Sequence, residues 1–317
     1  MRIFLAGSTG VIGRRLIPLL VQAGHQVTGM TRSEAKFELL RSLGAEPVVA
    51  DALDREGLAA AVAAARPEAV VHELTDIPAA MNPKKYEQEM AGNDRLRIEG
   101  TRNLVDAARA AGASRIVAQS IAFAYAPGKA LRTEEDPLQD TGDGSGFGRT
   151  VAALASLEES VTGAGGVVLR YGYFYGPGSA YAPDGAFAAL MRKRRMPVVG
   201  NGAGVWSFVH VDDAASATVA ALGLDGPAIF NVCDDEPMAA REWVPEFAAG
   251  VGAPKPMRVP RFVARIAAGE FAVYAMTAQP GASNLRFKKA TGWEPQWRTV
   301  REGFARGRDE GGNDGTE

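Results

Sequence analysis

Short apolar runs alternate with helical stretches through the first half of the chain. The apolar runs are rich in β-branched residues and predict strands at residues 3–6, 26–30, 47–50, 69–73, 115–119 and 167–170. Segments rich in Ala, Leu and Arg lie between them and predict helices at residues 11–23, 34–43, 55–65, 93–111 and 150–162. Several strands are apolar throughout, as in a sheet that is covered on both faces. The pattern therefore predicts an α/β fold with a doubly wound parallel sheet.

The rhythm changes after about residue 170, where loops rich in Gly, Pro and Tyr separate isolated helices and strands. We expect the sheet to gain strands near residues 207–211 and 229–232. The predicted organisation is a dinucleotide-binding domain at residues 1–170, completed by about 205–235. A smaller, mostly helical substrate lobe is expected at residues 171–204 and 236–305. The Gly-, Asp- and Glu-rich residues 306–317 predict a disordered tail.

Seven residues directly follow the first predicted strand and open the first helix, namely Gly7, Ser8, Thr9, Gly10, Val11, Ile12 and Gly13. Their GxxGxxG spacing is a variant of the dinucleotide-binding fingerprint. In that fingerprint one glycine permits a tight turn, the next lets the backbone approach a pyrophosphate, and the third allows close packing of helix on strand. A glycine triplet alone can be a flexible turn, but this one lies between a strand and a helix, as the fingerprint requires. We therefore predict a dinucleotide site in a Rossmann domain.

The end of the second predicted strand indicates which dinucleotide is bound. NAD-selective sites place an acidic residue there to bond the ribose hydroxyls, whereas this chain has Thr31 followed by Arg32. A guanidinium suits a 2′-phosphate, so we predict NADP(H); the alternative is a solvated surface arginine. Asp51 follows the third strand and is placed to take the adenine amino group, although capping of its loop explains it almost as well. We expect further cofactor contacts from Ala52, Leu74 and Tyr171.

The composition and net charge of the chain argue against several classes of function. Hydrophobic residues make up 46% of the 317 residues and the formal net charge is −2, so no cationic field favours nucleic acid or an anionic membrane. The single cysteine excludes an intrachain disulfide, and the three histidines are too far apart for a zinc site, so no metal is expected. The apolar run at residues 3–6 is too short for a signal peptide. We expect a soluble, cytoplasmic protein.

Several motifs carry a resemblance to a known family. They are Gly100-Thr101-Arg102-Asn103-Leu104, Leu169-Arg170-Tyr171…Tyr175-Gly176-Pro177, Phe208-Val209-His210-Val211-Asp212-Asp213 and Gly292-Trp293-Glu294-Pro295. With the glycine turn, they make the chain resemble an extended or atypical short-chain dehydrogenase/reductase of the NAD-dependent epimerase/dehydratase family over about residues 1–305. The resemblance implies an oxidoreductase and a homodimer formed through two helices on one sheet face.

The chain departs from that family at the acid–base pair. Family members carry Tyr-x-x-x-Lys at the start of the helix after the fifth strand, where the ammonium lowers the phenol pKa and orients the cofactor ribose. Here Phe147 replaces the tyrosine and Val151 replaces the lysine. Tyr125 has Lys129 four residues on, but the intervening Pro127-Gly128 argues against the helical turn that such a pair requires.

The resemblance places the catalytic Ser or Thr of the family at the end of the fifth strand, where Ser120 stands. We predict that Ser120 bonds a substrate carbonyl oxygen. The alternatives are that it satisfies backbone groups, or that a gap of one residue puts Ile121 in its place. Gln119 and Tyr125 are nearby polar candidates for substrate contact.

The residues that read a sugar nucleotide in the family are also missing. Tyr173 stands where these members carry asparagine and is followed by Phe174, while Val205 and Trp206 occupy the place of an arginine. A diphosphate needs cationic or dense amide partners, whereas these side chains favour a flat, apolar ligand with one polar edge. We predict that Phe147, Tyr173, Phe174 and Trp206 contact such a substrate; alternatively, the aromatic residues pack the lobe interface.

The leading hypothesis is an NADPH-dependent ketoreductase of an aromatic or conjugated carbonyl compound, similar to the atypical ketoreductases of aromatic polyketide (angucyclinone-type) antibiotic biosynthesis. Without the tyrosine, the substrate itself must delocalise the negative charge left by hydride addition, as a phenolate or enolate does. Two rival hypotheses are a nucleotide-sugar epimerase or dehydratase with other acid–base residues, and a non-catalytic NADP(H)-binding sensor or interaction protein.

Overall fold

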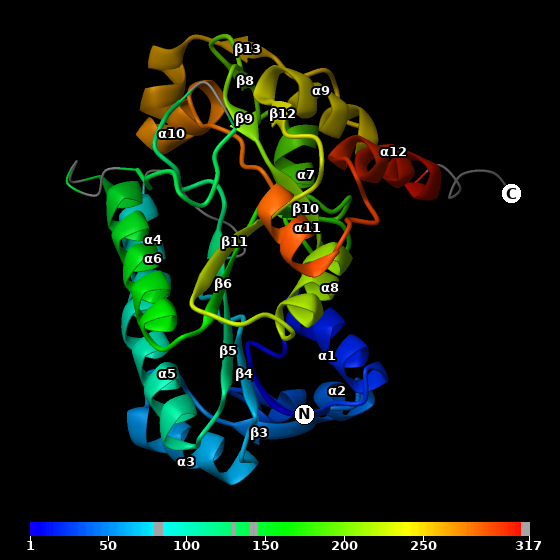
Figure 1. The fold of residues 1–317 in the computed structure, drawn as a ribbon. Helices are drawn as coiled ribbons and strands as arrows, with labels where there is room; N and C mark the ends of the chain where they lie inside the picture. Colours follow the sequence, from blue (N-terminus) through cyan, green and yellow to red (C-terminus); the bar gives the residue numbers. More distant parts are fainter. Residues whose placement is uncertain (79–84, 129–130, 140–141, 143–144, 312–317) are drawn as a thin grey trace, which may run out of the picture.

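A computed structural model describes residues 1–78, 85–128, 131–139, 142 and 145–311, and a seven-stranded parallel sheet runs through its centre (Figure 1). The strand order is β11-β6-β5-β4-β1-β2-β3. The bounds are β1 Arg2–Ala6, β2 Gln26–Thr31, β3 Glu46–Val49, β4 Ala69–His72, β5 Arg115–Ile121, β6 Val167–Tyr171 and β11 Ala228–Val232. The chain reverses its direction of winding between β1 and β4, and this topology confirms the predicted Rossmann-like fold.

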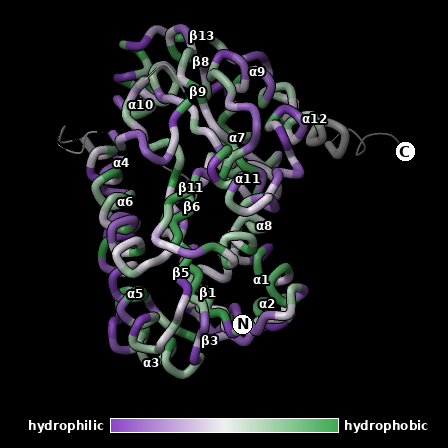
Figure 2. Tube along the Cα trace, viewed as in Figure 1, coloured by the Kyte–Doolittle hydropathy of each residue, from purple (hydrophilic) through white to green (hydrophobic). Residues whose placement is uncertain are grey.

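Helices cover both faces of the sheet. One face carries α1 Gly13–Gln22, the short η1 Glu34–Lys36 with α2 Phe37–Ser42, α8 Val211–Ala221 and α11 Leu285–Thr291. The other carries α3 Arg55–Ala65, α4 Tyr86–Arg95, α5 Thr101–Ala110 and α6 Gly146–Gly163. The hydrophobic colouring of the strands in Figure 2 runs between these layers, as expected for strands buried on both faces. The helix predicted at residues 93–111 is interrupted by a π-helical segment, Leu96–Gly100 (η3), between α4 and α5.

The smaller lobe has its own hydrophobic core. It contains α7 Ala186–Arg192, α9 Ala240–Gly250, α10 Arg261–Thr277 and α12 Val300–Gly311. Three two-stranded pairs accompany them: β7 Tyr173–Tyr175 with β10 Phe208–His210, β8 Val198–Val199 with β13 Arg258–Val259, and β9 Val205–Trp206 with β12 Met238–Ala239. The strand expected near residues 207–211 therefore pairs outside the main sheet, which corrects that prediction. Helix α12 extends into the segment expected to be a tail, and residues 312–317 lie outside the described residues.

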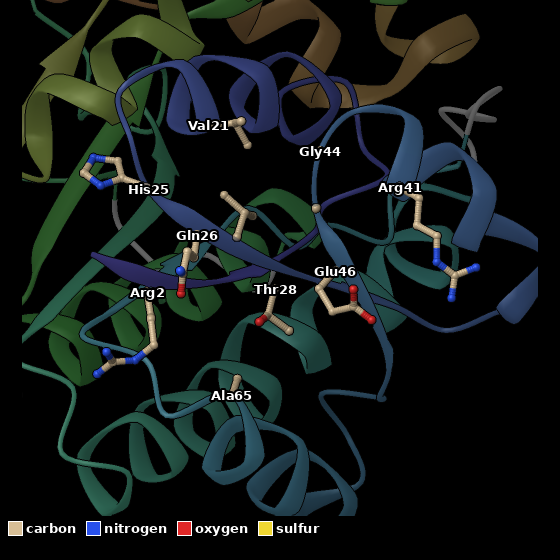
Figure 3. A pocket seen from close by; sticks show the side chains of 11 residues that line it. Arg2, Val21, His25, Gln26, Thr28, Arg41, Gly44, Glu46 and Ala65 are labelled. Carbon is tan, nitrogen blue, oxygen red and sulfur yellow. The ribbon is translucent and has the colours of Figure 1, made fainter.

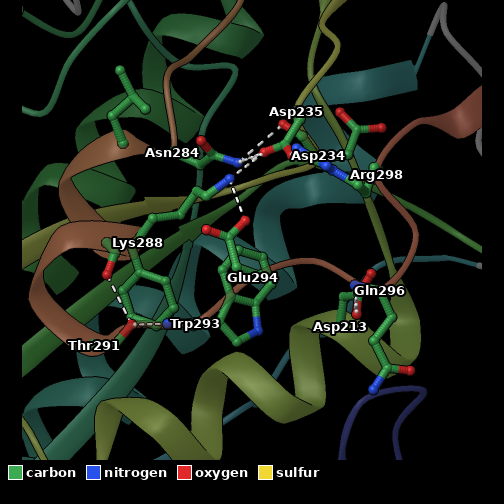
Figure 4. Close-up of polar contacts among 12 residues, drawn as sticks. Asp213, Asp234, Asp235, Asn284, Lys288, Thr291, Trp293, Glu294, Gln296 and Arg298 are labelled. Atoms are coloured by element: carbon green, nitrogen blue, oxygen red, sulfur yellow. Dashed lines mark hydrogen bonds and ion pairs between the residues drawn. The ribbon is translucent and has the colours of Figure 1, made fainter.

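The family motifs near the C-terminus fasten the lobe to the sheet (Figure 4). Asp213 on α8 accepts hydrogen bonds from the backbone N–H groups of Gln296 and Trp297, both at 2.9 Å. After β11, the Asp235 carboxylate lies 3.0 Å from Lys288 Nζ on α11 and 2.8 Å from Arg298 Nη2. These contacts hold the segment after α11 beside the carboxyl ends of the strands. Within the described ranges, no helix is long and apolar enough to cross a membrane.

Candidate functional site

The glycine turn lies at the carboxyl end of β1, beside β4, where the sheet reverses its winding. Gly7 has a φ of +93°, and a Cβ at this position would overlap the carbonyl oxygen of Glu73. A Cβ at Gly13 would overlap the carbonyl oxygen of Gly7, and the Gly10 N–H donates to that same oxygen at 3.0 Å. Only glycine fits the two crowded positions, and the turn ends at the amino end of α1. The turn therefore fits the pyrophosphate of a dinucleotide.

Ser8, one of the two polar residues of the turn, stabilises the fold of the turn. Ser8 is fully buried, and its Oγ donates to the carbonyl oxygen of Met30 at 2.6 Å, which ties the turn to the end of β2. Ile12 packs in the core beneath α1, whereas Thr9 and Val11 are half-buried. The backbone, rather than the side chains of Ser8 or Ile12, is what this turn can offer to a phosphate.

The adenine end of the predicted site is open to solvent. Arg32 follows β2, its side chain is 69% exposed, and its Nη2 lies 3.7 Å from Asp76 Oδ1. An exposed ion pair at this distance holds the guanidinium only weakly, so Arg32 can turn towards a ligand. Asp51 Oδ1 accepts from the Leu53 N–H at 2.9 Å, so the loop-capping alternative describes this residue. Ala52 is buried, and its carbonyl oxygen accepts from Asn103.

A buried acidic residue that the sequence analysis missed, Glu73, lies against the glycine turn through its backbone carbonyl. Glu73 directly follows β4, and its Oε1 lies 3.4 Å from the hydroxyl of Tyr171, which also lies 2.7 Å from Thr218 Oγ1. Burial raises the pKa of Glu73 to about 8, so this carboxyl keeps its proton to a higher pH than a free glutamate does. Tyr171 is buried and its hydroxyl is held by these partners, so its predicted contact with the cofactor stays a prediction. The sequence did carry a signal for this residue, because Glu73 is an acidic residue placed directly after an apolar strand.

Ser120 belongs to a buried polar network. Its Oγ donates to Glu158 Oε1 at 2.7 Å, and Glu158 is paired with Arg170 through two hydrogen bonds of 2.8 and 2.6 Å. Arg170 also donates to the hydroxyl of Tyr125, which in turn donates to Asn231. This placement argues against the catalytic role predicted for Ser120 and the substrate contact predicted for Tyr125. Lys129 lies outside the described residues.

An apolar wall surrounds the place of the missing tyrosine. Phe147 and Val151 on α6 are buried in a cluster with Ile121, the alternative to Ser120. Phe271 of α10 covers Phe147 with ring centroids 4.3 Å apart. The predicted loss of both polar functions is thus matched by a hydrophobic environment at these positions.

Two tyrosine hydroxyls border this wall, and both already have acceptors. Tyr86 donates to Thr150 Oγ1 at 3.4 Å, and Tyr274 donates to the carbonyl oxygen of Tyr125 at 2.8 Å. Burial raises the pKa of both phenols above the ordinary value, which makes them weaker acids than a free tyrosine.

The aromatic residues predicted to bind substrate pack largely against one another. Tyr173 is stacked between Phe123 and Trp206, with ring centroids 3.9 and 4.1 Å apart, and its hydroxyl donates to Gln279. Trp206 Nε1 donates to the carbonyl oxygen of Ala275 on α10. The lobe-packing alternative therefore describes both residues.

Phe174 and Gln119, which were also predicted to contact substrate, lie outside that aromatic stack. Phe174 lies on the opposite side of its strand, against Tyr171, with ring centroids 5.4 Å apart. Gln119 donates to the carbonyl oxygen of Leu74 at 3.0 Å, which ties β5 to the segment after β4. Both Gln119 and Leu74 are half-buried at the carboxyl edge of the sheet, on the side where the glycine turn lies.

A pocket at the other end of the sheet is unrelated to this site. It is lined by residues at the amino ends of β1 to β3, among them Arg2, Gln26, Thr28 and Glu46 (Figure 3). Ligands of open α/β sheets bind at the carboxyl ends of the strands, where the glycine turn is.

Comparison with known proteins decides the family. The model of the NAD dependent epimerase/dehydratase family matches residues 3–233. The chain belongs to this family. A "3-diazoavenalumate denitrifying reductase" from Streptomyces is 44% identical over 309 residues, which cover 96% of this chain and 100% of the relative. The protein is accordingly an oxidoreductase of the short-chain dehydrogenase/reductase type.

The chain is also similar to a curated ketoreductase and to a solved epimerase structure. A "4-hydroxy-2-methyl-3-oxo-4-farnesyl-3,4-dihydroquinoline-1-oxide ketoreductase" from Stigmatella aurantiaca is 27% identical over 253 residues. The match covers 77% of this chain and 71% of the relative. The UDP-glucose 4-epimerase structure from Thermotoga maritima superimposes with a TM-score of 0.75, at 21% identity and 98% coverage of both chains. The structural likeness shows the fold alone.

Proposed function

We propose that this protein is an NADPH-dependent reductase of an aromatic substrate that accepts a hydride without receiving a proton from the protein. The observation that carries the proposal is the apolar wall of Ile121, Phe147, Val151 and Phe271 at the place of the missing tyrosine. A bound nicotinamide dinucleotide supplies the hydride. The residues of this chain position the acceptor and exclude water, and these two effects supply much of a rate enhancement.

The diazo substrate named for the Streptomyces relative fits this requirement. When a hydride replaces the diazonium group of an arene, a C–H bond forms, the C–N bond breaks and dinitrogen leaves with the bonding pair. The charges balance without a proton. An aryl diazonium is therefore the acceptor class that we propose first, since the named reductase shares 44% of its residues over its whole length.

A conjugated aromatic ketone, the class expected from the sequence, is the second candidate. The relative from Stigmatella aurantiaca is named as a ketoreductase and supports it. In this class hydride addition to the carbonyl carbon gives an alkoxide, which can take the proton of a neighbouring phenol of the substrate and leave a phenolate, whereas conjugate addition to a quinone-type acceptor gives an enolate; water protonates either anion later.

NADP(H) rather than NAD(H) is the proposed cofactor. Arg32 stands at the end of β2 with an exposed guanidinium, and Thr31 stands where an acid would repel a 2′-phosphate. The glycines of the turn would hold the pyrophosphate through backbone N–H groups. We also propose that the substrate lies between Phe147 and the lobe, and that the protein forms a homodimer.

The test is oxidation of NADPH and of NADH in the presence of a diazophenol, a hydroxylated quinone-type ketone and the O-methyl ether of that ketone. When [4R-²H]NADPH and [4S-²H]NADPH are tested separately, we expect one of the two to place deuterium at the carbon that carried nitrogen, with release of one dinitrogen per NADPH. We expect the ketone to react faster than its methyl ether, because only the free phenol delocalises the charge. A reaction without enzyme gives the background rate for the diazonium.

Three results would contradict the proposal. Equal turnover of the ketone and its methyl ether would show that the phenol of the substrate does not assist reduction of the ketone. Tight binding and turnover of a UDP- or dTDP-sugar would favour an epimerase or dehydratase. Binding of NADPH with no hydride transfer to any acceptor would favour the non-catalytic hypothesis.

A further inference from the structure

A cluster of buried polar side chains at the junction of α4, η3 and α6 has no role in the function proposed so far. Arg97 in η3 has a side chain that is 7% exposed, and its Nη1 lies 3.8 Å from Asp94 Oδ1, beyond hydrogen-bond distance. Three buried atoms have no hydrogen-bond partner within the described part of the chain: Asn93 Nδ2, Asp94 Oδ1 and Arg97 Nη1. Buried polar groups in native proteins are nearly always satisfied, so three such atoms within about one helical turn indicate a missing ligand or water.

The backbone at this point is also unusual. Residues Leu96–Gly100 form a π-helical segment between two α-helices, and such segments occur frequently at functional sites. Arg97 is buried, and so is His72, the last residue of β4. Burial and, after it, the charge of Arg97 lower the pKa of His72 to about 4, so the charge of Arg97 acts on this imidazole.

The cluster borders the segment after β4, and Asp76 of this segment also pairs with Arg32. Asn93 Oδ1 accepts from the Asp76 N–H at 2.9 Å, which fixes the segment after β4. That same segment begins with Glu73, whose carbonyl oxygen flanks Gly7 of the glycine turn. A dinucleotide that places its adenine half near Arg32, after β2, extends its other half past β4 towards β5.

The cluster also adjoins the segment of α6 that has lost its lysine. Thr150, the neighbour of Val151, donates to Asp94 Oδ2 at 3.2 Å, and Asp94 is the acidic neighbour of Arg97. Among the described residues of α4 and η3, Arg97 is thus a buried cation. Its acidic neighbour Asp94 contacts α6 next to Val151, the residue that stands in the place of the lysine.

We propose that Arg97 binds the nicotinamide nucleotide half of the cofactor, donating a hydrogen bond to its ribose or adjoining phosphate. The inference rests on the proposed function only in requiring a nicotinamide dinucleotide. Asp94 and Asn93 are positioning residues, because they hold the π-helical turn against α6 and the segment after β4.

The test compares two ligands by fluorescence or calorimetric titration. NADPH contains both nucleotide halves, whereas adenosine 2′,5′-bisphosphate contains only the adenine half. We expect Arg97→Met to weaken NADPH binding about 10- to 100-fold, as for loss of a hydrogen bond to a charged group, and to leave bisphosphate binding unchanged. Arg97→Lys should recover part of the loss. Arg32→Ala should weaken both ligands, because both carry the 2′-phosphate.

Arg95→Met is the matched control, because Arg95 lies two residues away with its side chain 58% exposed and paired with Glu99. It should bind both ligands as the wild type does. If Arg97→Met does not fold, Arg97→Gln, which keeps a donor in the cluster, is measured in the same way. Should NADH bind better than NADPH, the comparison uses NADH and ADP.

Equal weakening of both ligands, or of neither, by the Arg97 variants would overturn the inference. Absence of any dinucleotide binding by the wild-type protein would instead contradict the proposed function. The two failures are therefore distinguishable in one set of titrations.

Discussion

Gly7→Ala should abolish tight binding of NADPH. The new Cβ would overlap the carbonyl oxygen of Glu73, and Gly7 has a φ of +93°, so the turn must shift away from the segment after β4. The backbone N–H groups would then miss the pyrophosphate, and each charge-assisted hydrogen bond of this kind is worth about 1.5–3 kcal/mol. We expect the Kd measured by fluorescence titration to rise by roughly 100-fold or more, which corresponds to about 2.7 kcal/mol.

Gly24→Ala separates this effect from backbone strain. Gly24 also has a positive φ, of +79°, but a Cβ there meets no atom within 4 Å. It should lower the free energy of unfolding by about 1 kcal/mol and leave the Kd unchanged. If Gly7→Ala does not fold, Gly10→Ala gives a milder change, since its Cβ lies 3.2 Å from the Gly7 carbonyl oxygen. Wild-type affinity in the Gly7 and Gly10 variants would show that the dinucleotide binds elsewhere.

Arg170→Met should produce the largest loss of stability. Arg170 and Glu158 are paired with side chains only 5% and 7% exposed, and the same guanidinium donates to Tyr125. Removing the arginine leaves the Glu158 carboxylate buried, with the Ser120 hydroxyl as its one remaining donor among the described residues. Breaking a buried pair in this way costs about 3–5 kcal/mol, which we expect to see as a lower urea midpoint with an unchanged m-value.

Two control variants test the cause of that loss. Arg41→Met removes an exposed i,i+3 pair with Glu38 and should change stability by less than about 1 kcal/mol. The double variant Glu158→Met/Arg170→Met replaces both charges by apolar side chains and should recover most of the loss. A double variant as unstable as Arg170→Met alone would show that the packing of the arginine, rather than its charge, is what stabilises the protein.

The sheet and the glycine turn could be predicted from the sequence because each is encoded locally. Apolar runs and the GxxGxxG spacing are properties of neighbouring residues, and the crowding at Gly7 and Gly13 is a backbone requirement. The loss of the acid–base pair, predicted from the identities of Phe147 and Val151, stays a prediction; the structure adds that both side chains lie in an apolar cluster.

Strand register and burial could not be predicted in the same way. A shift of one residue along β5 exchanges Ser120, which faces Glu158, with Ile121, which faces Phe147, and the sequence fits both alternatives. The aromatic identity of Tyr173 and Trp206 does not reveal that the two rings stack on each other. Glu73 and Arg97 are ordinary charged residues in the sequence, and only their burial distinguishes them.

The most direct test of the central claim measures hydride transfer in a single turnover. Enzyme saturated with NADPH is mixed with the diazophenol in a stopped-flow instrument, and the loss of NADPH absorbance is followed in Tyr86→Phe, Tyr274→Phe and the wild type. These phenols border the apolar wall, so they are the hydroxyls to remove. We expect similar rates of hydride transfer in all three proteins and no solvent deuterium isotope effect on these rates. A fall of about 10²–10⁴-fold in either variant, with NADPH affinity unchanged, would identify a protein proton donor and contradict it.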